Sequence, residues 1–128
     1  MPKSAATLVR MKHLIALLSL CCVHNAWSQD ALPPRSEWRA SSSSVENPLL
    51  ASPLAIDGDA KTRWGGPFSA GHWFQLDFGR ATSVGGIMIR WDSGFAASYV
   101  IQASTDGKSW RTAFDTSDSP GEIGRAHV

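Results

Sequence analysis

The sequence of 128 residues has only two cysteines, Cys21 and Cys22, which are adjacent and lie near the N-terminus. No cysteine follows them, so the rest of the chain has no disulfide of its own, no cysteine nucleophile and no thiolate ligand for zinc. The stability of that part therefore has to come from an apolar core or from a metal bound by other ligands.

The sequence also lacks an excess of basic charge. Residues 29–121 contain 8 basic and 10 acidic side chains, which gives a net charge of −2 with histidine neutral. No basic stripe, polybasic run or basic amphipathic segment is present. We therefore expect no binding to nucleic acid and no attraction to an anionic membrane surface.

The one long apolar run, LIALLSLCCV, lies near the N-terminus and is too short to span a bilayer as a helix. Basic residues precede it, and Ala26 and Ser28 follow with the small-x-small spacing of a cleavage site. This pattern predicts a secretory signal peptide over residues 1–28, with Met11 as an alternative start. We expect the protein to be secreted to the extracellular medium or the periplasm.

Two further stretches lie outside the expected domain. Residues 29–36 are a polar, proline-containing linker. The last residues break the pattern before them, and residues 123–128 can be encoded by a string that resembles a sequencing-library adapter. We therefore expect residues 122–128 to be a non-native tail, with a genuine short polar tail as the alternative. The domain then occupies residues 37–121.

Within that domain the sequence shows no helical apolar period and has strand signals instead. Phe74, Leu76 and Phe78 alternate with Trp73, Gln75 and Asp77, the two-residue period of a half-buried strand. Similar runs predict strands around residues 38–41, 83–91, 98–104 and 109–116. Asp106-Gly107 predicts a hairpin between the last two, because glycine adopts positive φ without steric cost. Short strands with turn residues between them predict an all-β sandwich or barrel.

The stretch AIDGDAKTRW, residues 55–64, has three interpretations. A catalytic acid pair at Asp57 and Asp59 would need a cleft and partner groups, and no nearby histidine or Ser/His/Asp arrangement supplies them, so we predict no catalytic residue. A calcium loop would use oxygens of Asp57, Asp59 and Thr62 on a chain that bends tightly at Gly58. A simple turn would direct the carboxylates at backbone N–H groups. The last two interpretations remain open.

Residues 55–64 and the segments HWFQLDFG, IRW and SYVIQASTDGKSW follow one another in an order and spacing that resemble the discoidin family, also called the coagulation factor five/eight type C domain. The similarity runs from about Trp38 to Gly121. Bacterial members of the family include galactose-type carbohydrate-binding modules. The resemblance implies a jelly-roll, discoidin-like antiparallel β-sandwich whose closing strands lie beyond Gly121. We therefore expect a sandwich that is incomplete at its C-terminus and does not fold stably alone.

The resemblance also assigns roles within the motif. It implies that Asp57, Asp59 and Thr62 hold a structural calcium ion, completed by a carboxylate near the C-terminus of the full domain. It further implies that Trp64 is a packing residue rather than a platform for a sugar ring.

A sugar site, by the same resemblance, lies in loops at one end of the sandwich, over residues 41–48, 65–72 and 91–98. The candidate ligand-binding side chains in these loops are Phe68, His72, Asp92 and Phe95. An aromatic face with neighbouring hydrogen-bonding groups is what a pyranose requires. The third loop reads WDSGFAAS and lacks the arginine and Asn-Gly of galactose-binding members, so the resemblance does not imply galactose specificity.

These expectations describe a secreted, non-catalytic carbohydrate-binding module that is the N-terminal fragment of a larger carbohydrate-active or surface protein. One alternative is a glycoside hydrolase or oxidase whose catalytic domain is missing from this fragment. The other is a protein or phospholipid adhesion module, in which apolar loop residues such as Leu49 and Leu50 insert into a membrane or a partner.

Overall fold

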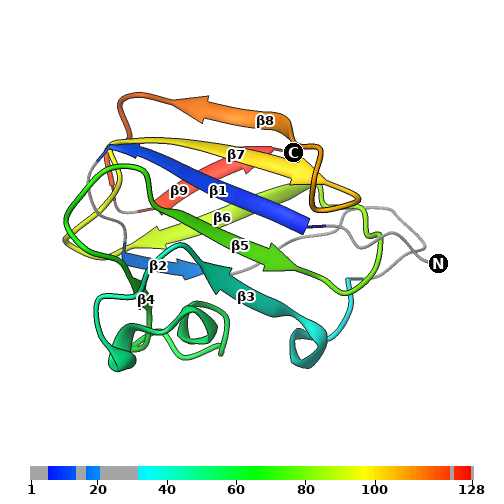
Figure 1. Ribbon diagram of the computed structural model, residues 1–128, viewed down its shortest axis with the longest axis horizontal. Coiled ribbons are helices and arrows are strands. Elements are labelled where there is room, and N and C mark those ends of the chain that lie inside the picture. The colour runs from blue at the N-terminus through cyan, green and yellow to red at the C-terminus, as the bar shows by residue number, and fades with distance from the viewer. Residues whose placement is uncertain (1–5, 14–16, 21–31, 122, 128) are drawn as a thin grey trace.

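The structure, a computed structural model, describes residues 6–13, 17–20, 32–121 and 123–127, which form two antiparallel sheets (Figure 1). The five-stranded sheet has the order β3 (Arg39–Ser42), β5 (Trp73–Asp77), β1 (Ala6–His13), β7 (Ser98–Ser104), β8 (Arg111–Thr116). The four-stranded sheet has the order β4 (Trp64–Gly65), β2 (Leu17–Leu20), β6 (Gly86–Trp91), β9 (Ile123–His127). The predicted all-β, discoidin-like sandwich is therefore confirmed.

Three short 3-10 helices precede β4, namely η1 (Arg35–Glu37), η2 (Pro48–Leu50) and η3 (Ser52–Ala55). The proline in each of the last two lies in its first turn, where the missing N–H costs nothing. None of the helices in the described part of the chain is long and apolar enough to cross a bilayer.

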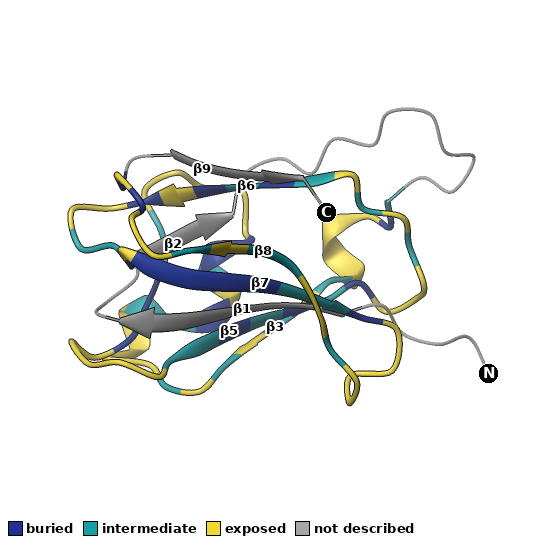
Figure 2. Ribbon diagram, turned by 90° about the horizontal axis from the view of Figure 1, so that it is seen from above, coloured by how far each residue is buried: buried dark blue, intermediate teal, exposed yellow. Residues whose placement is uncertain are grey.

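The core lies between the two sheets and follows the predicted alternation. Phe74, Leu76 and Phe78 are each at most 2% exposed, whereas their neighbours along β5 are half-buried. The facing sheet contributes Ile87 and Ile89 from β6. Figure 2 shows β7 as a largely buried strand of its sheet, in agreement with its burial pattern. The period of two thus placed the apolar side chains on the inner face of each sheet.

Trp64 is fully buried and connects the core to a surface loop. Its ring packs against Phe74 with centroids 5.4 Å apart, and its indole Nε1–H donates to the backbone carbonyl of Ser44 at 2.9 Å. The packing role expected for Trp64 is confirmed. Because the indole reaches a loop carbonyl, the same residue that fills the core also fixes residues 43–46 above it.

β1 and β2 come from the segment predicted to be a signal peptide, and each occupies an interior position in its sheet. β1 pairs with β5 and with β7, and β2 pairs with β4 and with β6. Strand pairing does not test cleavage, so the signal peptide over residues 1–28 stays a prediction. Its remaining residues lie outside the described part of the chain, as do linker residues 29–31.

Residues 123–127 form β9, which pairs antiparallel with β6 from Gly86↔His127 to Arg90↔Ile123. The sequence predicts that this segment lies outside the domain, because it has no apolar alternation. Backbone pairing needs no such alternation, so the segment adds a strand at the edge of the sheet. Strand pairing does not test the gene sequence, so the prediction that residues 122–128 are a non-native tail stays a prediction.

The predicted hairpin at Asp106-Gly107 joins β7 to β8. Gly107 has φ of 72°, the conformation for which glycine was predicted. The carboxylate of Asp106 accepts the backbone N–H groups of Ser109 and Lys108, each at 2.8 Å, and the hydroxyl of Ser104 at 2.9 Å. These hydrogen bonds, that from Ser109 first, lower the pKa of Asp106 from 3.8 to about 2.

This depressed pKa predicts a specific acid sensitivity. The carboxylate is more acidic in the folded than in the unfolded chain, so it stabilises the fold above about pH 4, and that contribution is lost as the pH falls toward about 2. Melting temperatures measured from about pH 5 to about pH 2 should therefore fall less in Asp106→Asn than in the wild type. Parallel curves for the two proteins would contradict this role.

Candidate functional site

The Asp57 loop begins directly after η3 and is shaped by two successive turns. The backbone N–H of Asp59 donates to Asp57 Oδ1 at 2.8 Å, and that of Lys61 donates to Asp59 Oδ1 at 2.9 Å. Between them Gly58 has φ of 88°, which permits the tight bend. The interpretation of this stretch as a turn whose carboxylates accept backbone N–H groups is confirmed.

The hydroxyl of Thr62 closes the same loop from inside. Its Oγ1 lies 2.6 Å from Asp57 Oδ2, 3.0 Å from the Asp59 carbonyl oxygen and 3.3 Å from the Leu54 carbonyl oxygen. One hydroxyl proton thus faces three acceptors. The bond from Thr62, followed by that from the Asp59 amide, lowers the pKa of Asp57, so this carboxylate is ionised at neutral pH.

Such an oxygen-rich, proton-poor cluster suits a hard cation. Calcium takes about six to eight oxygens and accepts carbonyls, hydroxyls and carboxylates together. Part of that shell can come from Asp57, Thr62 and the carbonyls of Leu54 and Asp59. The Oδ1 of Asp59 already accepts the backbone N–H of Lys61. Within the described ranges no group of three or more His, Cys, Asp or Glu side chains is placed to hold a metal. Calcium binding therefore stays a prediction, with Leu54 as a contributor that the sequence did not suggest.

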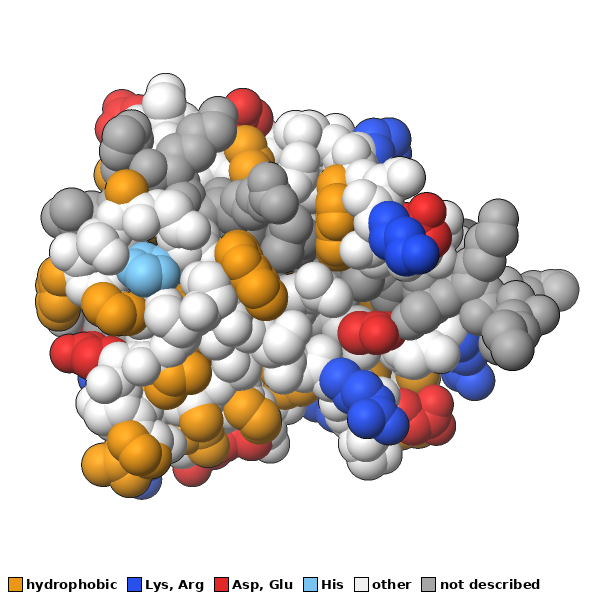
Figure 3. Space-filling model, in the orientation of Figure 1, with side chains coloured by type: hydrophobic (Ala, Val, Ile, Leu, Met, Phe, Trp, Pro, Cys, Tyr) orange, Lys and Arg blue, Asp and Glu red, His pale blue; other side chains and the backbone are white. Residues whose placement is uncertain are grey.

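His72 is fixed by hydroxyl groups on both sides of its ring. Nδ1 lies 2.7 Å from Ser44 Oγ and 3.4 Å from Ser43 Oγ, and Nε2 lies 2.7 Å from Ser69 Oγ. These contacts join the serine-rich loop to the loop that carries His72. Figure 3 shows histidine side-chain surface in pale blue on this face of the molecule, with hydrophobic side chains beside it.

Phe68 lies on the same loop as His72 and is 69% exposed. At Gly66 the loop packs closely against Trp64 and Ser44. A Cβ added at Gly66 would lie 3.3 Å from the Trp64 ring and 3.4 Å from Ser44 Oγ. An exposed aromatic ring is therefore held on a loop that is anchored to the buried Trp64.

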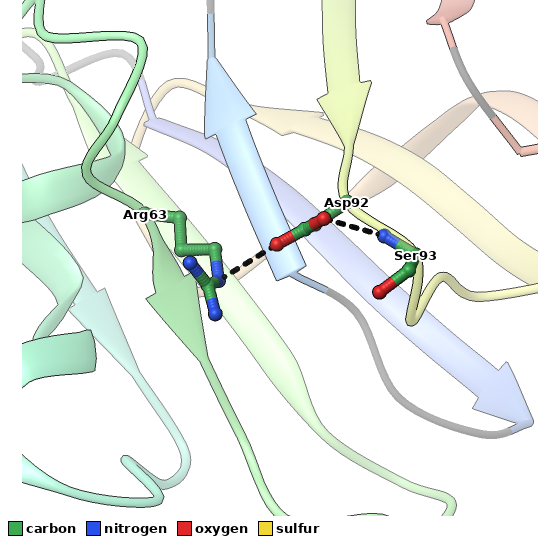
Figure 4. Close-up of polar contacts among 3 residues, drawn as sticks. All are labelled: Arg63, Asp92 and Ser93. Atoms are coloured by element: carbon green, nitrogen blue, oxygen red, sulfur yellow. Dashed lines mark hydrogen bonds and ion pairs between the residues drawn. The ribbon is translucent and has the colours of Figure 1, made fainter.

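Asp92 and Phe95 have different surroundings. Asp92 Oδ2 lies 3.2 Å from Arg63 Nε, while Oδ1 accepts the backbone N–H of Ser93 at 2.7 Å (Figure 4). Phe95 is half-buried against the core, and its ring occupies the space in which Gly121 would carry a Cβ, at 2.8 Å. No hydrogen bond or ion pair recorded for the described residues links Asp92 to His72.

Of the four predicted sugar-contacting residues, Phe68 and His72 therefore lie on the same loop, and Asp92 and Phe95 are engaged elsewhere. Sequence reasoning missed the partners of this set, Ser44, Ser69 and Arg63, although the serine-rich loop had been included among the sugar loops. Hydrogen bonding between distant loops leaves no local pattern, so only the structure identifies these partners.

Comparison with protein families finds that the F5/8 type C domain profile matches residues 38–127, more than half of the chain. The chain belongs to the F5/8 type C domain family. The predicted discoidin resemblance is confirmed.

A curated relative is the polysaccharide lyase 8 family protein HylA of Enterococcus faecalis, which is 28% identical over 74 residues. The aligned segment covers 58% of this chain and 5% of that protein, so the F5/8 type C chain described here spans only a small part of the relative's length. No solved structure matches the chain significantly.

The oxygen cluster predicts weak calcium binding. Because the described residues supply only part of the shell, we expect a Kd of about 1 mM, so that about 10 mM Ca²⁺ stabilises the fold by about 1.4 kcal/mol. Asp57→Asn should abolish the rise in melting temperature caused by Ca²⁺. Asp106→Asn is the matched control, because it makes the same change in another carboxylate that caps a turn, and it should keep the rise. An equal rise in all three proteins would place the cation elsewhere.

Proposed function

We propose that this chain is a secreted, non-catalytic carbohydrate-binding module that holds a larger protein at a glycan. Membership of the F5/8 type C family supports this, since domains of this kind often bind carbohydrates. A relative that is a polysaccharide lyase family protein supports it as well. The observation that carries the proposal is that one loop carries both the exposed ring of Phe68 and His72, whose two imidazole nitrogens contact serine hydroxyls.

The geometry of this pair suggests how a pyranose would bind. The apolar face of the sugar would stack on Phe68, and a sugar hydroxyl would take over a hydrogen bond to His72. Both imidazole nitrogens already have a serine partner, so one serine has to yield. Ser69 is the one that can, because it is exposed and turns about a single torsion, whereas Ser44 is partly buried, lies close to Gly66 and accepts the indole N–H of Trp64 at its carbonyl. A site built from so few contacts binds weakly and suits attachment to a repetitive polymer.

Export is part of this proposal. The N-terminal pattern of basic residues, a short apolar run and small residues would direct the protein to the periplasm or the medium. There the module would act beside whichever catalytic or surface domain it is joined to. A full-length glycoside hydrolase or oxidase is compatible with this role, because the module itself then supplies binding and not chemistry.

An adhesion module is the second candidate, and one observation favours it. Val45, Leu49 and Phe68 are the exposed large hydrophobic side chains among the described residues; Val45 lies on the serine-rich loop, Leu49 on η2 and Phe68 on the loop that carries His72. The Glu46 N–H donates to the Gly65 carbonyl at 2.9 Å, which holds these loops together. Neighbouring apolar side chains on loop tips are what a membrane surface or a protein partner would bury.

Three alanine variants separate these candidates. Phe68→Ala and His72→Ala should each lower binding on a glycan array by at least about tenfold if a sugar stacks on the ring and bonds to the imidazole. Leu49→Ala removes an apolar side chain that is more exposed than Phe68 and has no part in the sugar contact, and it should leave glycan binding unchanged. Loss of liposome binding in Leu49→Ala, with no glycan bound by the wild type, would reject the carbohydrate function in favour of adhesion.

A further inference from the structure

A second concave site lies away from the Phe68 and His72 pair. It is a cavity of about 310 Å³ between the loop that follows Asp59 and the end of β6. The residues that line it are Ala60, Lys61, Thr62, Arg63, Arg90, Trp91 and Asp92. Only Asp92 among them was considered as a ligand-binding residue from the sequence.

The strand register explains why charged side chains meet here. Trp64 and Trp91 both pair with Leu18 of β2, and both side chains are buried in the core. Successive residues of a strand point to opposite faces, so Arg90, next to Trp91, is exposed on the outer face of the sheet. Arg63, which precedes Trp64, and Asp92, which follows Trp91, meet beside β2 (Figure 4).

The cavity has an excess of positive charge. Lys61, Arg63 and Arg90 contribute three cations, against the single carboxylate of Asp92. Asp92 pairs with Arg63, whereas no ion pair within the described ranges involves Lys61 or Arg90. Asp59 is close in sequence, but its Oδ1 accepts the backbone N–H of Lys61. Two cations that have no ion-pair partner among the described residues therefore border the cavity.

Arg63 forms an ion pair with Asp92. Its Nε lies 3.2 Å from Asp92 Oδ2 without making a hydrogen bond, and the two side chains are 37% and 45% exposed. Figure 4 shows the two terminal guanidinium nitrogens turned away from Asp92. The terminal N–H groups on that side match the spacing of the oxygens in a carboxylate or sulfate group.

We propose that this cavity binds the anionic group of an acidic sugar, either the carboxylate of a uronic acid or a sulfate ester. The inference rests on the proposed carbohydrate function and specifies its ligand as an acidic glycan. Arg63 forms the bidentate contact, Lys61 and Arg90 supply the surrounding positive charge, and Trp91 lines the cavity beside them. Binding weakens as salt rises, because exposed charges are screened.

The test removes the two cations that have no partner. The full chain is compared with the double variants Lys61→Gln/Arg90→Gln and Lys108→Gln/Arg111→Gln; the second pair lies at the β7–β8 hairpin of the other sheet and removes the same charge. Binding is measured to three oligosaccharides of equal length. One contains uronic acids, one carries sulfate esters on otherwise neutral sugars, and one has no charged group. We expect the first variant to lose about tenfold in affinity for an acidic oligosaccharide and nothing for the neutral one, with the control unchanged.

The two acidic oligosaccharides decide which anionic group is recognised. Equal losses in both double variants would show an effect of net charge alone and overturn the proposal. Equal affinity of the wild type for acidic and neutral oligosaccharides would overturn it as well.

A smaller probe separates this proposal from the carbohydrate function itself. Free glucuronate and free inorganic sulfate are titrated into ¹⁵N-labelled protein, and the Nε–H signal of Arg63 and the backbone signals of residues 60–63 are followed. Shifts there, with no oligosaccharide bound, would keep the anion site and reject the carbohydrate function. No shift at these signals would reject the anion site, even if neutral sugars perturb His72.

Discussion

Both sheets depend on a strand at an interior position that comes from the N-terminal segment. β1 hydrogen-bonds to β5 on one side and β7 on the other, and β2 does the same between β4 and β6. Without them the five-stranded sheet divides into β3–β5 and β7–β8, and β4 loses its partner. Two-stranded pieces are marginally stable in water, and interior backbone groups left without partners are costly. If the predicted signal peptide is removed, both positions have to be filled by other strands for the sheets to remain whole.

The same two sheets place the chemistry on the loops and on one outer surface. Trp64 is the clearest link, since its ring lies in the core while its indole holds Ser44, whose hydroxyl in turn contacts His72. One residue earlier in the chain, Arg63 reaches Asp92 on the surface of the sheet. An exposed aromatic ring, an imidazole held by serine hydroxyls and a basic cavity thus lie on segments that a few buried side chains position.

The sequence predicted those features that are encoded locally. The alternation of Phe74, Leu76 and Phe78 determines which face of a strand is buried, and Asp106-Gly107 needs only its own turn geometry. Features that depend on distant partners were not predictable in this way. The contact between Arg63 and Asp92 arises only when two strands meet on either side of β2. The interior position of β1 was missed because its segment has the composition of a signal peptide, and β9 was missed because it has no apolar alternation.

The most direct test of the dependence on these interior strands compares the full chain with one that begins at Gln29, in urea unfolding followed by tryptophan fluorescence. In the structure β1, β2 and β9 complete the two sheets, so we expect the full chain, in contrast to the expectation from its sequence, to show one cooperative transition. Loss of β1 and β2 should leave Trp64 and Trp91 without a continuous core, so the shorter chain should show none. A shorter chain that unfolds with the same midpoint and the same slope as the full chain would contradict the requirement for these strands.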